Sequence, residues 1–188
     1  NEIILLFCTM LTSLILGMGV PTTANYVITS TIAAPALIGL GVPILAAHMF
    51  VFYFCIIADI TPPVALAAYA VAAISGGDPL KTGVNASKLG IAAFIVPYVF
   101  VLSPALLGIH ASAGQVIMTT ITALIGMVGI SSAMIGYLYR RLNAIERLII
   151  FAAGLCLIDP EYFTDLVGIG VMIALVAFQY FRSRKVNA

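Results

Sequence analysis

The chain contains 188 residues, of which 63% are apolar and only 8% are charged. A typical soluble domain has about 45–50% apolar and about 25% charged residues. A soluble fold of this length could not bury so much apolar surface, so the composition indicates an integral membrane protein. The net charge of +1 gives no basis for binding nucleic acid. The three cysteines have no paired spacing, which predicts neither a disulfide framework nor a zinc site.

The chain begins with Asn1-Glu2 and enters an apolar stretch at once, without a charged leader. We therefore expect no signal peptide at this end and interpret the chain as the C-terminal part of a longer protein.

The first 76 residues are apolar but are interrupted by Gly, Pro and Thr. The uninterrupted segments are 3–16, 26–38, 44–58 and 64–75. As helices they would each reach only about 18–23 Å, which is too short to cross a hydrocarbon core of about 30 Å. Half-length helices with such breaks are typical of discontinuous helices and re-entrant hairpins, where transporters bind substrates and ions.

The remaining apolar runs are separated by clusters of charge. Runs 89–109 and 115–139 are long enough to predict two transmembrane helices, joined by a short turn at 110–114. Asp159-Pro160-Glu161 interrupts the last run and predicts a terminal hairpin, with helices at about 144–158 and 163–182. The predicted fold class is an all-α integral membrane protein: a re-entrant helical hairpin and a broken transmembrane helix, followed by about four further helices.

The basic residues predict the topology, because Lys and Arg in short loops favour the cytoplasm. If 115–139 runs inward and 89–109 runs outward, every basic cluster falls on the cytoplasmic side, and so does the C-terminus. The clusters are Lys81 and Lys88; Arg140, Arg141 and Arg147; and Arg182, Arg184 and Lys185.

The first break offers oxygen ligands and flexible backbone. Glycines allow positive φ and close approach of a ligand, and Thr and Asn side chains can cap the helix that follows. An unwound segment at membrane depth leaves carbonyls that can coordinate a hard cation, and the next half-helix directs its positive end toward an anion. The candidate binding residues here are Gly17, Gly19, Pro21, Thr22, Thr23 and Asn25.

The second break is Asp59-Ile-Thr-Pro-Pro63, and its candidate binding residues are Asp59, Thr61, Pro62 and Pro63. The prolines lack an N–H, so we expect carbonyls upstream of them to lose their helical partners and to be free for a ligand. An acid at membrane depth indicates function by default. Two simpler interpretations remain: each break is only a packing kink, and Asp59 only caps the next helix from a watery vestibule.

Other polar and small residues receive structural interpretations. His48 and His110 lie near predicted helix ends and are assigned no role. The small residues of 115–139 predict a face for helix packing. They are Gly126, Gly129, Ser131, Ser132 and Gly136.

Two motifs resemble the large membrane subunit (DctM-type) of tripartite ATP-independent periplasmic (TRAP) transporters. They are Gly17-Met-Gly-Val-Pro-Thr-Thr-Ala-Asn-Tyr-Val27, and Ala58-Asp-Ile-Thr-Pro-Pro-Val-Ala-Leu-Ala67 followed by Gly76-Gly-Asp-Pro79. They occur in order and at the expected separation. The Ala-Asp before Thr-Pro-Pro is most similar to the fused permease of the TAXI branch. The resemblance covers about residues 1–110, and the terminal hairpin fits the extra helices of such permeases.

The resemblance implies half of an inverted-repeat elevator transporter. Residues 1–76 would be part of the transport domain, with a periplasm-entering hairpin at 1–41 and a broken helix at 44–76. A cytoplasmic loop would follow at 77–88, two transmembrane helices at 89–141, and a helical hairpin with a basic tail at 142–188. The two breaks would meet near the middle of the membrane.

The resemblance also implies a function. The chain would be a permease subunit that imports a small carboxylate with sodium, across the cytoplasmic (inner) membrane of a bacterium or archaeon. Its partners would be a periplasmic solute-binding protein, the remaining N-terminal part of the permease and the lipid bilayer. Sodium would be the coupling ion, with no other cofactor and no enzymatic activity. Its candidate ligands are Gly17, Thr23, Asp59 and Thr61.

Two alternatives remain open. A proton-coupled carrier of related architecture would use Asp59 as the relay. An intramembrane hydrolase would need a second carboxylate beside Asp59, or a base such as His48 brought by folding near Ser13 or Ser30. Sodium-dependent uptake in proteoliposomes would favour the transporter, and sodium-independent peptidase activity would favour the hydrolase.

Cysteine labelling tests the predicted topology. A cysteine at Lys81 or Arg141 should react only from the cytoplasm, and one at Ala113 only from the periplasm, because basic loops stay inside. Labelling of positions 81 and 113 from the same side would contradict a crossing between them.

Overall fold

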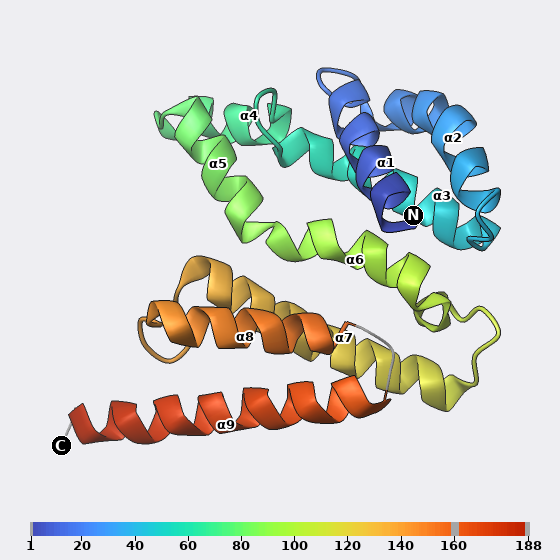
Figure 1. Ribbon diagram of the computed structural model, residues 1–188. Coiled ribbons are helices and arrows are strands. Elements are labelled where there is room, and N and C mark those ends of the chain that lie inside the picture. Colours follow the sequence, from blue (N-terminus) through green and yellow to red (C-terminus); the bar gives the residue numbers. More distant parts are fainter. Residues whose placement is uncertain (1, 159–161, 187–188) are drawn as a thin grey trace. The chain divides into compact units, whose positions relative to one another are not determined.

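The computed structural model describes residues 2–158 and 162–186, and the predicted Asp159-Pro160-Glu161 break lies outside these residues. The described residues form helices and no β-strand, which confirms the all-α fold class. The chain divides into two compact units, residues 1–107 and 108–188, each described by itself (Figure 1).

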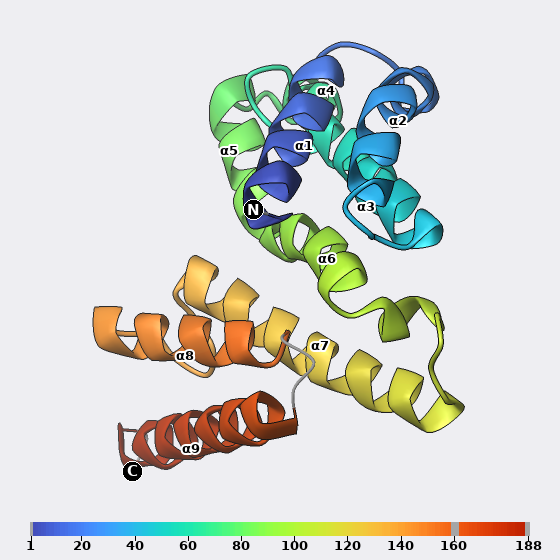
Figure 2. The same cartoon turned by 45° about the vertical axis from the view of Figure 1, so that its right-hand side comes forward.

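The first unit begins with a helical hairpin. α1 (Glu2–Leu16) and α2 (Thr22–Ile38) lie side by side and pack against α3 (Ile44–Ile57), as Figures 1 and 2 show. Pro21 and Pro43 precede the first residues of α2 and α3, where a missing N–H costs no helical hydrogen bond. The core of this unit contains Leu6 of α1, Leu37 of α2 and Phe50 of α3, together with Val101, all buried.

A break interrupts the helix that follows the hairpin. α3 tightens into a 3-10 turn, η1 (Ala58–Ile60), and regular helix resumes only at α4 (Leu66–Ser75). The intervening residues 61–65 contain Pro62 and Pro63, whose missing N–H groups prevent α3 from continuing. α4 ends at Gly76, which adopts the left-handed conformation with φ +71°.

The next segment differs from the sequence prediction in two respects. The loop predicted at 77–88 is mostly helical, because α5 (Pro79–Leu89) starts at Asp78, whose carboxylate accepts the Lys81 N–H at 2.9 Å. The prediction of one continuous helix over residues 89–109 is wrong. α6 (Ile91–Leu102) ends before Ser103, and a 3-10 turn, η2 (Pro104–Leu107), follows.

The second unit packs three helices closely: α7 (Ala113–Ile135), α8 (Ala144–Cys156) and α9 (Tyr162–Val186). A Cβ on Gly126 would lie 2.8 Å from the Gly154 carbonyl, and one on Gly129 would lie 3.0 Å from Met172. These contacts confirm the predicted packing face. Gly136 instead ends α7 with φ +79°.

One described helix, α7, is long and apolar enough to cross a membrane by itself. α5 and α6 together meet the same criterion, with a bend of 42° between them. The other apolar helices of the described ranges are shorter, as expected of helices interrupted at Gly and Pro.

Gly154→Ala tests the close packing of α7 and α8. The new Cβ would lie 2.7 Å from Ile130 Cγ1 and 2.8 Å from the Gly126 carbonyl. We expect a loss of about 1–3 kcal/mol in the free energy of unfolding, measured by thermal or denaturant unfolding in detergent. Gly170→Ala is the control, because nothing lies within 4 Å of its added Cβ. Equal stability of both variants would contradict the packing.

Candidate functional site

The two predicted breaks meet in the first unit. Gly17 follows the last residue of α1 and lies against α2 and the end of α3. A Cβ added at this position would lie 2.6 Å from Ala58 Cβ and 2.4 Å from Asn25 Nδ2. A side chain at position 17 is therefore excluded by sterics. The C-terminal ends of α1 and α3 and the first turns of α2 thus come together at one point.

A hydrogen bond joins the two breaks directly. The Thr22 hydroxyl, at the start of α2, donates to Asp59 Oδ2 at 2.9 Å across 37 positions of sequence. Both side chains are partly buried. The bond is assisted by the charge of the carboxylate, and it holds the tip of the hairpin to the end of α3.

Asn25 is a deeply buried member of the predicted site residues, with 1% of its surface exposed. Its Nδ2 donates to the Ser13 carbonyl at 3.3 Å, and its Oδ1 accepts the Thr29 hydroxyl at 2.9 Å. The Ser13 carbonyl also accepts the Gly17 N–H at 3.0 Å. The amide therefore closes the end of α1 against α2, a structural role beside the candidate site.

The carbonyls at the second break have partners within the chain. The Thr61 hydroxyl donates to the Ile57 carbonyl at 2.7 Å, and the Thr61 N–H to the Ala58 carbonyl at 3.1 Å. The Ser87 hydroxyl of α5 donates to the Ile60 carbonyl at 2.9 Å. The expectation that these carbonyls are left without partners is thus wrong for residues 57, 58 and 60. A carbonyl oxygen has two lone pairs, so each can still face a cation.

The other predicted residues lie farther out. Gly19, Pro21, Thr23 and Pro63 are exposed, and Pro62 is half-buried. Gly19 has φ +79° and open space around its Cβ position, so its backbone conformation, and not crowding, favours glycine there. Thr23 is exposed in the first turn of α2 and takes no part in the Thr22–Asp59 contact.

Helix ends give this junction its electrostatic character. The C-terminal ends of α1 and α3 place partial negative charge at Gly17 and Ala58, and Asp59 adds a carboxylate. The start of α2 places partial positive charge at Thr22. An oxygen-rich, negative junction suits a hard cation, and the α2 start beside it suits an anionic group.

Comparison with known proteins identifies the family. Residues 1–115 match the family model described as the DctM component of the tripartite ATP-independent periplasmic transporter. The chain belongs to the DctM family. The DctM match includes both breaks and all of the predicted site residues. Residues 116–169 match a domain of unknown function, DUF3394. No curated protein and no solved structure matched the chain.

Membership of the DctM family makes the chain a membrane component of a secondary transporter, which works with a periplasmic binding protein on a small-molecule substrate. The family is one of transporters and not of enzymes. The intramembrane hydrolase considered above therefore has no support from the family.

Sequence reasoning missed several residues that build the junction. Ser13, Thr29, Ala58 and Ser87 supply its contacts but were not among the candidate binding residues. A signal was present for two of them, because Ser13 lies four residues before Gly17 and Thr29 four after Asn25. Polar or small residues four apart share one face of a helix.

Gly17→Ala tests the junction. The methyl group should separate the end of α1 from Asn25 and Ala58 and reduce the free energy of unfolding by about 1–3 kcal/mol. Gly114→Ala is the matched control, because its Cβ would have no neighbour within 4 Å. Thermal unfolding in detergent measures both. A Gly17→Ala protein as stable as the control would show that the breaks are not in contact.

Proposed function

We propose that this chain is part of a sodium-coupled permease and that its residues 1–76 belong to the transport domain. It would import a small carboxylate, delivered by a periplasmic binding protein, by an elevator motion across the cytoplasmic membrane. The observation that supports this most is the Thr22–Asp59 hydrogen bond, because it couples the hairpin tip to the broken helix. A site made by two discontinuous elements can close around an ion and a substrate together.

The sodium site would lie at the junction of the breaks. Thr61 and Thr22 both use their hydroxyl hydrogens, donating to Ile57 and Asp59 respectively, so the lone pairs of both hydroxyl oxygens can face a cation. The Asp59 carboxylate supplies the charge, and the C-terminal ends of α1 and α3 add carbonyls. Gly17 would contribute its carbonyl. Thr23 would join only if the first turn of α2 rotated inward on binding.

The carboxylate substrate would face the start of α2. Backbone N–H groups in the first turn of a helix have no helical acceptors, and they bind anions together with the helix dipole. Pro21 lies just before this turn, Thr22 and Thr23 form it, and Gly19 keeps the approach open.

Proton coupling is the second candidate, supported by the same carboxylate. If Asp59 carried the proton, Asp59→Asn would abolish coupled uptake, and sodium would have no effect on binding or transport. Sodium binding to the purified protein separates the two mechanisms without knowledge of the solute.

Variants of Asp59 and Thr61 test the sodium site by binding of radioactive ²²Na⁺ to the complete purified permease. Thr61→Ala removes one oxygen and should weaken sodium binding about tenfold, which corresponds to about 1.4 kcal/mol. Thr61→Ser keeps the oxygen and is the matched control, with binding close to that of the wild type. Asp59→Asn should weaken binding more than Thr61→Ala does, because it removes the charge.

Two results would contradict the sodium site. Unchanged sodium binding in both Thr61→Ala and Asp59→Asn would remove the second break from it. Absence of saturable sodium binding in the wild type, with intact proton-driven uptake, would favour the proton-coupled carrier.

A further inference from the structure

The second unit has an apolar groove that contains none of the candidate binding residues. It has a volume of about 570 Å³ and lies between α7 and α9. Its lining residues are Leu124, Ile125, Val128, Tyr139, Met172, Ile173, Val176 and Ala177. The Tyr139 hydroxyl is the one polar side-chain group among them. Such a volume lies within the range of about 300–1,000 Å³ that is usual for ligand sites.

The groove is open to its surroundings on the side of α7 and α9. Val128 and Ile173 line it with 58% and 64% of their surfaces exposed. On α7 the groove extends only from Leu124 to Val128, little more than one helical turn. A further helix packed into this groove would need a longer contact surface along α7. A flexible hydrocarbon chain can fill a groove as short as this one.

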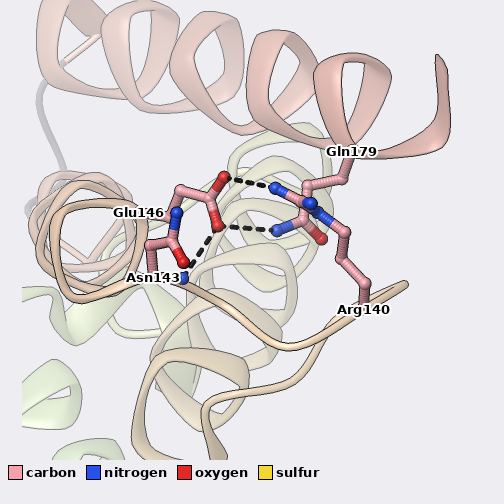
Figure 3. Close-up of polar contacts among 4 residues, drawn as sticks. All are labelled: Arg140, Asn143, Glu146 and Gln179. Carbon is pink, nitrogen blue, oxygen red and sulfur yellow. Dashed lines mark hydrogen bonds and ion pairs between the residues drawn. The ribbon is translucent and has the colours of Figure 1, made fainter. Parts of the chain in front are cut away.

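One end of the groove is polar and charged. Tyr139 precedes Arg140, whose Nη2 forms an ion pair with Glu146 Oε1 at 3.0 Å. Gln179, two residues beyond the lining residue Ala177, donates to Glu146 Oε2 at 3.2 Å. Figure 3 shows Arg140 and Gln179 beside the Glu146 carboxylate. The Asn143 N–H donates to the same carboxylate at 2.9 Å.

The charge at this end is positive. Glu146 is neutralised by Arg140, and the Arg147 guanidinium is held by the carbonyls of Ala133 and Met134 at the end of α7. Arg141 is exposed in the tight turn that also contains Tyr139. Basic clusters at the ends of membrane helices attract anionic lipid headgroups.

We propose that this groove binds an acyl chain of an anionic phospholipid, with its phosphate at the basic turn that contains Arg141. The apolar lining excludes a polar ligand, and the positive end selects a negative headgroup. Tyr139 lies between the two, where an amphipathic ring suits the boundary of hydrocarbon and headgroups. Leu124, Val128 and Tyr139 fall within the domain of unknown function, so this proposal gives that region a lipid-anchoring role.

Native mass spectrometry of the full chain tests the proposal. The protein is titrated in detergent with dioleoyl phosphatidylglycerol or with dioleoyl phosphatidylcholine, which share acyl chains but differ in net charge. One phosphatidylglycerol should bind saturably and more tightly than phosphatidylcholine. Arg141→Gln should weaken phosphatidylglycerol binding about fivefold, the usual effect of one basic residue near an anionic surface. Lys81→Gln, which removes one exposed positive charge from the first unit, should change neither affinity.

A second pair of variants tests the groove itself. Val128→Trp should fill it and abolish the saturable phosphatidylglycerol. Ile117→Trp is the matched control: residue 117 lies on the same face of α7 about three turns earlier, is 59% exposed, and does not line the groove. Equal affinity for the two lipids, or equal lipid binding by the two Trp variants, would overturn the proposal. A dimer that is lost in Val128→Trp, with lipid binding retained, would assign the groove to a second copy of the chain and overturn it too.

Discussion

Backbone polar groups that leave a helix inside a bilayer must find partners within the protein, because lipid offers none. The first unit satisfies this constraint at two breaks at once. The Gly17 N–H donates to Ser13, and hydroxyls from Thr61 and Ser87 donate to the carbonyls of Ile57 and Ile60. These bonds come from three helices, α1, the end of α3 and α5. The first two bonds are each local to one helix end, whereas the Ser87 bond ties the second break to α5, and the Thr22–Asp59 hydrogen bond joins the two breaks directly.

The same constraint explains why the junction suits transport. A break whose backbone groups bond within its own chain keeps its shape, but each bonded carbonyl still has a lone pair, and each donating hydroxyl keeps its oxygen. Gly17 allows the elements to approach without a side chain between them. In the proposed sodium site, this cluster of oxygens beside a carboxylate would be preorganised for a small cation, so binding would cost little ordering of the chain.

The sequence predicted the local features well, because local chemistry sets them. Pro21, Pro43 and the Pro62–Pro63 pair mark helix starts and a break, and the helices observed begin and end around them. The start of α5 was missed although Asp78-Pro79 is a strong N-cap signal, because its polar composition favoured a loop. The helix break at Ser103, within the predicted span 89–109, is not marked by a Gly or Asp in the sequence. Pro104 is the one signal there.

Contacts between distant segments could not be predicted from patterns of spacing. Thr22 and Asp59 are 37 residues apart, and Ser87 and Ile60 are 27 apart. Gln179 and Glu146 are 33 apart, on helices whose pairing the charge pattern does not specify. Periodicity shows which face of a helix is polar, but packing decides which polar faces meet. Family resemblance supplied the expectation that the two breaks meet, and the hydrogen bond identifies the atoms involved.

The most direct test of this account is a double-mutant cycle on sodium affinity with Thr22→Val, Asp59→Ala and the double variant. If the two breaks form one site through the Thr22–Asp59 bond, the effects should be non-additive by about 0.5–3 kcal/mol. The sodium affinity of the double variant would then be about equal to that of the single variant with the lower affinity. Strictly additive effects would show that the hairpin tip and the helix break act independently, which would contradict the account.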